Sequence, residues 1–286
     1  MRLEILDSLT DPSKPGAEND DRIGWNETAA FVIDGATMLG DPIMAPPLSD
    51  AAWIADRARQ QFEAELTPER SIRDVVRGLS EAARERFLAA AGTTVERHRH
   101  PSASFQSLRL TDHGIEIAGL GDCSLFLRDA AGALTRYSGL RGGRSGEQSS
   151  ARKALTRLGG LNLGGEGYRD AETLAGLRAS RARKNTEGGV WTLGIHPQAA
   201  EHVRIEIPNA TLPAIGILCS DGFADSVDNY RLHTAADLIA RAERDGLRPL
   251  LAEIRRVERE TDPDGLQFPR YKRSDDASAI LVKLHG

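Results

Sequence analysis

Acidic residues lie beside glycines at the ends of several predicted strands. The sites are Asp20-Asp21, Asp34-Gly35, Ser220-Asp221-Gly222 followed by Asp225, and Asp275-Asp276. A single aspartate in such a place commonly just closes a turn. Four of them can instead converge at one edge of a folded sheet, where their mutual repulsion would require a cation. Because the set contains oxygen ligands and no His or Cys, it favours Mg²⁺ or Mn²⁺ over zinc.

The strands and helices that must position these residues are grouped along the chain, several strands together and then a pair of helices. Apolar runs between turn residues predict strands at 3–6, 28–33, 104–110, 114–119, 123–128, 134–137, 190–195, 203–207, 215–219 and 279–284. Apolar residues at helical spacing predict a helix capped by Ser49 and a second capped by Thr67, with Pro68 in its first turn and an end at Gly92. Two more are predicted near 234–245, with a capping box of Thr234 and Asp237, and near 247–261. The closely spaced strands of 104–137 favour an antiparallel meander.

This segregation of strands and helices favours an α+β fold, a four-layer αββα sandwich of two antiparallel sheets flanked by helix pairs. No linker divides the chain, so we expect a single domain over residues 1–286, and we expect it to be a monomer. With 37 Lys and Arg against 42 Asp and Glu, the net charge of −5 argues against nucleic acid or an anionic membrane as a partner.

Two features of the sequence indicate the cellular compartment of the protein. The first fourteen residues carry charge too early for a secretory signal, and no apolar run is long enough to cross a membrane. Cys123 and Cys219 each stand among apolar residues, as buried thiols of a reduced compartment do. We therefore expect a cytoplasmic protein.

Five short motifs occur along the chain in one order. They are Glu18-Asn19-Asp20-Asp21-Arg22, Val32-Ile33-Asp34-Gly35-Ala36-Thr37, Gly119-Leu120-Gly121-Asp122-Cys123, Leu218-Cys219-Ser220-Asp221-Gly222-Phe223-Ala224-Asp225 and Arg273-Ser274-Asp275-Asp276-Ala277-Ser278. Together they resemble the motifs of the metal-dependent protein phosphatases, the type 2C serine/threonine phosphatases, in their bacterial form. The resemblance implies the αββα sandwich and two Mn²⁺ or Mg²⁺ ions, with room for a third.

The resemblance also implies roles for single residues. Asp34 would bridge both ions, Asp221 and Asp275 would complete the ligands of one, and Asp20 with the carbonyl of Gly35 would hold the other. Asp21 would orient water, and a hydroxide bridging the two ions would attack phosphorus. Catalysis would thus depend on Asp34, Asp221, Asp275 and Asp21. We interpret Asp122 as a turn residue and not as a ligand.

The chain departs from the family pattern at three positions. Ala36 stands where eukaryotic members have a His that could protonate the leaving group, and His98, His100, His196 and His202 are the replacement candidates. Gly16 stands where many members have a phosphate-binding Arg, which makes Lys14 a candidate phosphate ligand. Asp20 stands where Glu is usual.

Residues 139–190 fall where the family carries a variable flap. This segment holds Arg141, Arg144, Arg152, Lys153, Arg157, Arg169, Arg178, Arg181, Arg183 and Lys184. Such a segment can be a solvated loop, or a wall that attracts anionic substrate. In the second case Arg181 and Arg183 are the candidate substrate-binding residues.

Three functions fit these observations. The favoured one is a protein serine/threonine phosphatase acting on a phosphoprotein. A phosphatase with the same chemistry could instead act on a small phosphate ester of a metabolite, because the flap is long and the His is missing. A catalytically inactive binding or sensor module is the third, although such a module would have no reason to keep Asp34, Asp221 and Asp275.

Overall fold

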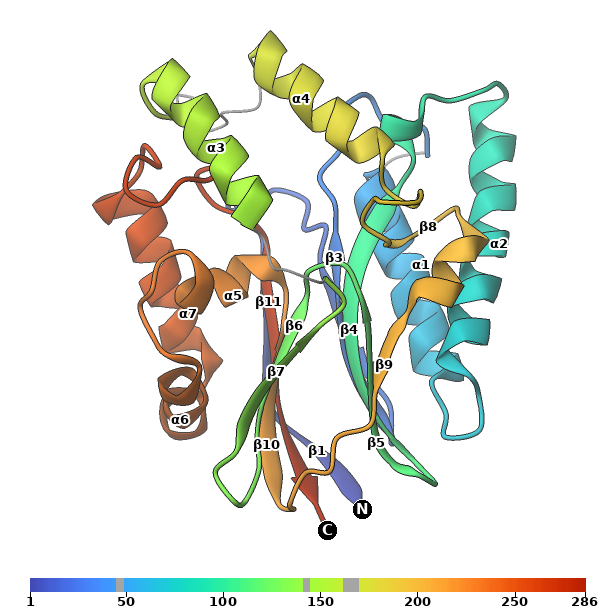
Figure 1. The fold of residues 1–286 in the computed structure, drawn as a ribbon, viewed down its shortest axis with the longest axis vertical. Helices are drawn as coiled ribbons and strands as arrows, with labels where there is room; N and C mark the ends of the chain where they lie inside the picture. Colours follow the sequence, from blue (N-terminus) through green and yellow to red (C-terminus); the bar gives the residue numbers. More distant parts are fainter. Residues whose placement is uncertain (45–48, 141–144, 162–169) are drawn as a thin grey trace.

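The computed structural model describes residues 1–44, 49–140, 145–161 and 170–286. Two antiparallel sheets face each other, and helices cover the outer face of each (Figure 1). This arrangement confirms the predicted α+β sandwich. Among the described residues, no helix is long and apolar enough to cross a membrane.

The first sheet has the strand order β1-β11-β10-β6-β7. Its strands are β1 (Arg2–Asp11), β11 (Ala277–His285), β10 (Ala214–Cys219), β6 (Ser124–Arg128) and β7 (Leu134–Ser138). The second sheet has the order β2-β3-β4-β5-β9, with β8 paired to β4. Its strands are β2 (Arg22–Trp25), β3 (Ala29–Gly35), β4 (Ser102–Thr111), β5 (Gly114–Leu120), β9 (Arg204–Glu206) and β8 (Leu193–Gly194).

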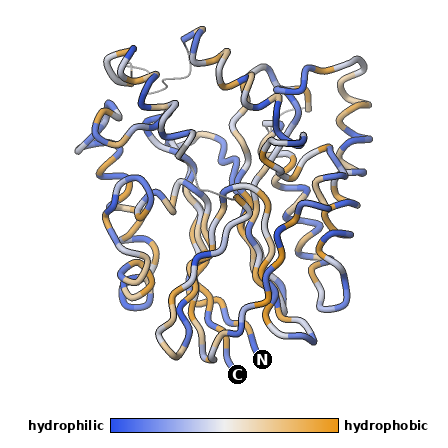
Figure 2. Tube along the Cα trace, in the orientation of Figure 1, coloured by the Kyte–Doolittle hydropathy of each residue, from blue (hydrophilic) through white to orange (hydrophobic). Residues whose placement is uncertain are grey.

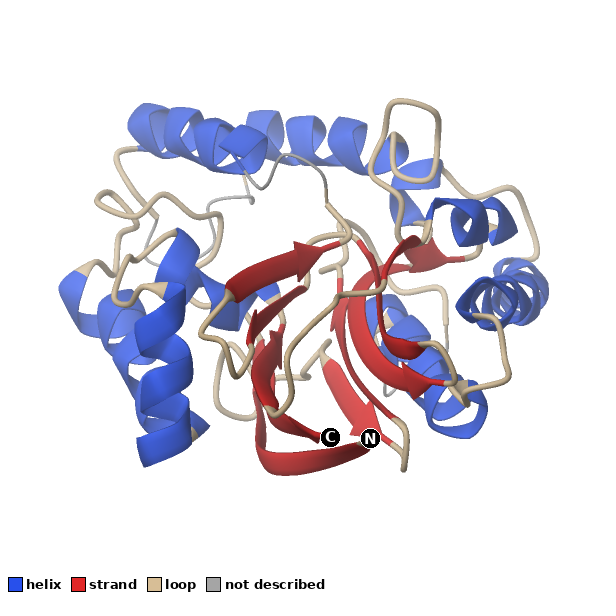
Figure 3. Cartoon of the chain, turned by 60° about the horizontal axis from the view of Figure 1, so that its bottom comes forward, coloured by secondary structure: helices blue, strands red, loops and turns tan. Residues whose placement is uncertain are grey.

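The helices fall into three groups (Figures 1 and 3). Against the second sheet lie α1 (Asp50–Glu65) and α2 (Ile72–Ala91), with the short turns η1 (Arg97–Arg99) and η3 (Pro197–His202) nearby. Against the first sheet lie α5 (Asp221–Asp228), α6 (Ala235–Asp245) and α7 (Leu247–Arg256), which continues as a π-helical turn, η4 (Val257–Thr261). Across one end of the sandwich lie α3 (Ser145–Leu158) and α4 (Ala171–Ala182).

Alternation along the strands builds three apolar layers. In β3, Phe31 and Ile33 pack toward α1 and α2, whereas Ala30 and Val32 pack into the space between the sheets. In β11, Leu281 points toward α6 and α7. The hydrophobic colouring of the central strands follows these layers (Figure 2). The sandwich is thus a rigid support for the loops at its ends.

Two of the predicted helix caps are confirmed, and the third is wrong. Ser49 accepts a hydrogen bond from the backbone of Ala52, and Thr234 forms a capping box with Asp237. The second helix, however, begins at Ile72 and not at Pro68. The reason is the buried guanidinium of Arg109, which donates to the carbonyls of Thr67 and Arg70 at 2.8 and 2.5 Å and so holds this stretch as a turn.

Two expectations about residues 104–190 are corrected. The strands of 104–137 are not one meander, because β5 pairs within the second sheet and β6 within the first, so the chain changes sheets at Gly121-Asp122. The segment 139–190 is not a solvated loop throughout, because the helices α3 and α4 form within it. Its Arg141, Arg144 and Arg169 lie outside the described residues.

Candidate metal centre

Three carboxylates gather at the end of the sandwich that α3 and α4 cover. One oxygen each of Asp34, Asp122 and Asp221 lies within 4.8 Å of the others, and all three residues are half-buried. Asp34 lies near the end of β3 in the second sheet, and Asp221 is the first residue of α5, directly after β10 of the first sheet. Asp122 lies where the chain crosses between the sheets. We call this group the aspartate triad; its hard oxygen donors suit a divalent cation such as Mn²⁺ or Mg²⁺.

The glycines that follow two of these aspartates permit close backbone contacts. A Cβ on Gly35 would lie 2.5 Å from the carbonyl oxygen of Asp20 and 3.0 Å from that of Ala51. A Cβ on Gly222 would lie 2.1 Å from the carbonyl oxygen of Asp276. The Asp-Gly doublets therefore bring backbone segments from different parts of the chain against the aspartates.

Asp122 lies in a turn, as predicted from the sequence, and its carboxylate also belongs to the closest acidic group. Gly121 has φ of +76°, and a Cβ there would lie 2.2 Å from Ser104 Oγ. That hydroxyl donates to Asp122 Oδ1 at 2.6 Å. The tight turn and this hydrogen bond from β4 orient the Asp122 carboxylate beside Asp34.

The electrostatics of the triad fit a cation. Burial, followed by repulsion from Asp221, Asp21 and Asp122, raises the pKa of Asp34 well above its usual value. Asp21 is 3% exposed, and burial with repulsion from Asp276 raises its pKa as well. Its Oδ2 has no hydrogen-bond partner among the described residues. A bound divalent ion would relieve this repulsion, so the residues present fit such a group.

The other acidic residues of the motifs lie beside the triad and have protein partners. Asp20 Oδ1 accepts from Ser49 Oγ at 2.5 Å, and its pKa is raised to about 6, chiefly by burial. Asp276 accepts from the backbone of Ser13 and of Asp20, both at 2.7 Å. Asp275 pairs with Lys272 at 2.5 Å. The structure thus places Asp20, Asp21 and Asp275 near Asp34 and Asp221, while Asp122 completes the closest group.

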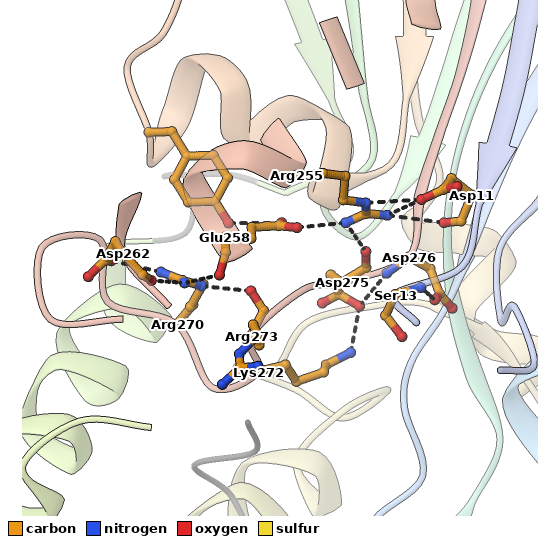
Figure 4. Close-up of polar contacts among 11 residues, drawn as sticks. Asp11, Ser13, Arg255, Glu258, Asp262, Arg270, Lys272, Arg273, Asp275 and Asp276 are labelled. Carbon is orange, nitrogen blue, oxygen red and sulfur yellow. Dashed lines mark hydrogen bonds and ion pairs between the residues drawn. The ribbon is translucent and has the colours of Figure 1, made fainter. Parts of the chain in front are cut away.

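A network of ion pairs holds the loop that carries Asp275 (Figure 4). The guanidinium of Arg255 donates to the backbone carbonyl of Asp275 at 2.8 Å, to buried Glu258 at 2.9 Å and to Asp11 of β1 at 3.0 Å. Farther along the loop, Arg270 pairs with Asp262 at 2.9 Å. Because these side chains are largely buried, the loop of residues 262–276 is fixed against both α7 and β1.

A cavity of about 890 Å³ opens over the triad. Its lining includes the acidic residues Asp34, Asp122, Asp221, Asp225, Asp275, Glu147 and Glu172 and the basic residues Lys153, Arg157, Arg181, Arg183, Lys184 and Lys272. Partial burial lowers the pKa of Arg181 to about 10, and burial together with Arg181 lowers that of Lys184 to about 8. Asp34 and Asp122 oppose both shifts. Arg181 and Lys184 thus line the same cavity as the triad, and we call the basic residues that the segment 139–190 contributes to it the cationic wall.

The other sequence candidates lie elsewhere. Lys14 is exposed in the β1–β2 connection and does not line this cavity, so the structure does not bring it to the triad. Of the histidine candidates, His100 Nδ1 and His196 Nε2 lie 3.1 Å apart, and His202 stacks on Trp191 with ring centroids 3.6 Å apart. None of these, nor His98, lines the cavity.

Three residues escaped the sequence prediction of the site: Asp122, Lys184 and Lys272. Asp122 belongs to a recognised motif, but its role depends on the change of sheet, which the pattern did not reveal. Lys184 closes a run of basic residues in which nothing distinguished it. Lys272 stands three residues before Asp275, and this spacing was the signal that could have found it.

No family profile matches the sequence, and no curated protein matches it. Solved structures do resemble it. The serine/threonine phosphatase PstP/Ppp of Mycobacterium tuberculosis is 12% identical, with a TM-score of 0.60 over 100% of both chains. The catalytic domain of the serine/threonine protein phosphatase PstP in complex with two manganese ions is 12% identical, with a TM-score of 0.57 over 100% of this chain and 99% of that one. The PPM Ser-Thr phosphatase MsPP of Mycobacterium smegmatis is 16% identical, with a TM-score of 0.52 over 99% of each chain. The chain therefore has the PPM phosphatase fold.

Proposed function

We propose that this chain is a Mn²⁺- or Mg²⁺-dependent phosphatase that hydrolyses phosphate monoesters, with phosphoserine and phosphothreonine side chains of proteins as its substrates. The observation that carries the proposal is a cavity lined both by the aspartate triad and by basic residues of the segment 139–190. Carboxylates bind the ion, and the basic residues attract the anionic substrate. The likeness in fold to solved serine/threonine phosphatases supports the same reading.

Asp34, Asp122 and Asp221 would hold the ion, with Ser104 orienting Asp122 by its hydrogen bond. When bound, the ion supplies acidification of a water molecule and neutralisation of charge on the phosphoryl oxygens. The unpartnered Oδ2 of Asp21 can accept a hydrogen bond from water beside the triad. Arg181 lines the same cavity, and its Nη1 donates to the carbonyl of Ala36 at 3.4 Å; we assign it to negative charge of the substrate remote from the scissile phosphate.

Ala36 has no proton to give to a leaving alkoxide, and we assign that part to Lys184. Its side chain lines the same cavity, and a pKa of about 8 lets it lose a proton near neutral pH. Lys184→Met should reduce turnover of a phosphoserine peptide far more than turnover of a nitrophenyl phosphate, whose leaving group needs little protonation. Equal losses on both substrates would contradict the assignment.

A second candidate substrate class is favoured by the shape of the site. The cavity has the volume of a small-molecule pocket, and α3 and α4 lie over it. A small ester carrying further negative charge would fit such a cationic enclosure. Turnover of phosphopeptides compared with that of sugar and nucleoside phosphates, each with Mn²⁺, separates the two classes.

The primary test is metal dependence. Hydrolysis of a nitrophenyl phosphate should stop in excess chelator and return with Mn²⁺ better than with Ca²⁺, which is larger and a weaker Lewis acid. Asp34→Asn should lower turnover by about 10²-fold or more with the fold intact. Asp112→Asn is the matched control, because Asp112 lies in an exposed turn between β4 and β5. Full activity in chelator, or rescue by Zn²⁺ alone, would refute the proposal.

The cationic wall gives a second test. Neutralising Arg181 and Arg183 together should raise KM for an anionic substrate while changing turnover of a small aryl phosphate little. The preference of the unmodified chain for the anionic substrate should shrink as ionic strength rises. An equal loss on every substrate would mean that the two arginines serve the fold or the metal centre instead.

A further inference from the structure

One buried guanidinium joins three segments of the chain beside Asp275. Arg255 of α7 donates to the backbone carbonyl of Asp275 at 2.8 Å and to the carboxylate of Glu258 at 2.9 Å (Figure 4). The same guanidinium donates to the carboxylate of Asp11 of β1 at 3.0 Å. The side chain of Arg255 is only 8% exposed and that of Glu258 only 1%, so water does not compete for these contacts.

Glu258 keeps the guanidinium in this orientation. Its Oε1 accepts a hydrogen bond from the phenol of Tyr230 at 3.1 Å, which leaves Oε2 for Arg255. Glu258 lies in η4, where the end of α7 widens into a π-helical turn, and such turns are frequent at functional sites. Because a buried carboxylate needs a cation beside it, Glu258 and Arg255 hold each other in place.

Asp275 is the residue whose position depends on this contact. It lines the cavity together with the triad, and burial and the charges of neighbouring aspartates, Asp275 among them, raise the pKa of Asp34. Asp34 lies within β3 and Asp221 directly follows β10, whereas Asp275 lies in the loop of residues 262–276 ahead of β11. A ligand on a loop is only as well placed as the contacts that fix its backbone.

We propose that Arg255 is a positioning residue of the metal centre. By binding the carbonyl of Asp275, it holds the carboxylate of that residue where it can share an ion with Asp34 and Asp221, as the family resemblance implies. Arg255 thus acts through the backbone of a ligand. The inference rests on the proposed function in requiring that the chain binds divalent cations at this centre.

Calorimetric titration of the metal-stripped full chain with Mn²⁺ measures the effect. Arg255→Met removes the donors and should raise the Kd for Mn²⁺ by roughly ten- to hundredfold, the usual range when a group that orients a metal ligand is lost. Arg255→Lys keeps the charge and one contact, and it should raise the Kd by about three- to tenfold, as for one or two lost hydrogen bonds. An unchanged Kd in Arg255→Met would overturn the proposal.

Arg109→Met is the matched control. Arg109 is likewise a buried arginine that pairs with a glutamate, Glu116, and donates to two backbone carbonyls, those of Thr67 and Arg70. It lies toward the end of β4 that is remote from the triad. Both substitutions should lower the free energy of unfolding of the metal-free chain, but only Arg255→Met should weaken Mn²⁺ binding. Equal losses of Mn²⁺ affinity would overturn the proposal.

A double-mutant cycle shows whether Arg255 acts through Asp275. In a chain that already carries Asp275→Ala, adding Arg255→Met should change the Kd by less than about threefold, because the ligand that Arg255 orients is gone. Losses that add in full would overturn the proposal. Where Arg255→Met does not fold, Arg255→Lys takes its place in the titration and in the cycle, with Arg109→Lys as its control.

These readouts concern Mn²⁺ binding and unfolding, not hydrolysis. Mn²⁺ binding that depends on Arg255 in a chain without phosphatase activity would therefore refute only the proposed function. Phosphatase activity in a chain whose Kd for Mn²⁺ is indifferent to Arg255 would refute only this inference. A chain that does not bind Mn²⁺ would refute both.

Discussion

Asp122→Asn should have opposite effects on the metal-free and the metal-bound protein. The substitution keeps the size of the side chain, and the amide oxygen can still accept from Ser104 Oγ, which lies 2.6 Å from Asp122 Oδ1. What it removes is one of three negative charges whose oxygens lie within 4.8 Å of one another. The metal-free chain loses a repulsion, and the metal-bound chain loses a ligand charge.

The size of each effect follows from that separation. Two unit charges 4.8 Å apart interact by about 3.5 kcal/mol at an effective dielectric constant of 20, which is an upper bound for half-buried groups. Because the raised pKa of Asp34 already relieves part of the repulsion, the metal-free variant should gain about 1 kcal/mol in free energy of unfolding. Loss of one charged ligand should weaken Mn²⁺ binding by about 2 kcal/mol, or about 30-fold in Kd.

Urea unfolding in excess chelator measures the first effect, and calorimetric titration with Mn²⁺ measures the second. Asp112→Asn, in its exposed turn, should change neither quantity. The sequence alone, with Asp122 as a turn residue, predicts only a mild effect of its substitution. A metal-free Asp122→Asn variant that is less stable than the unmodified chain, or one with unchanged Mn²⁺ affinity, would refute the placement of Asp122 in the triad.

Two further predictions concern stability. Gly222→Ala should lower the free energy of unfolding in urea by about 2–4 kcal/mol, because its Cβ would lie 2.1 Å from a backbone carbonyl oxygen. Gly176→Ala, in exposed α4 with nothing within 4 Å, should raise it by up to about 1 kcal/mol. Equal effects of the two substitutions would contradict the close contact at Gly222. Burial, followed by repulsion from Arg97, His100 and Arg84, lowers the pKa of His196 to about 4. Between about pH 4 and 6.5 the unfolded chain therefore binds more protons at this ring than the folded chain does. The free energy of unfolding then falls as the pH falls through that window. Between pH 7 and 5 these two pKa values correspond to a loss of about 2 kcal/mol, which the partial exposure of the ring reduces to about 1 kcal/mol. His196→Gln should remove this loss from the urea-unfolding difference, and an unchanged difference would mean that the ring titrates normally.

The sequence predicted helix ends correctly where they depend only on residues close by in the chain. The cap at Ser49, the capping box at Thr234 and the left-handed glycine that ends α2 at Gly92 all lie where the pattern placed them. Each depends on hydrogen bonds within a few residues.

Contacts between distant segments escaped the prediction. The start of α2 depends on Arg109, some forty residues farther along the chain, and the partner of Asp122 is Ser104 on β4. The same limit applies to two lysines. Lys14 was predicted as a phosphate ligand but does not line the cavity, whereas Lys184, predicted only as one basic residue of the segment 139–190, does.

The strand order of the first sheet has a consequence for the growing polypeptide on the ribosome. Between β1 and β6, both made early, lie β11 and β10, which span residues 214–285. A nascent chain that stops short of this stretch leaves β1 and β6 without the strands that join them, and Asp34 and Asp122 without Asp221. The aspartate triad is therefore assembled only after residues 214–285 have been made, so a nascent chain that stops short of this stretch should not bind a divalent cation at the triad.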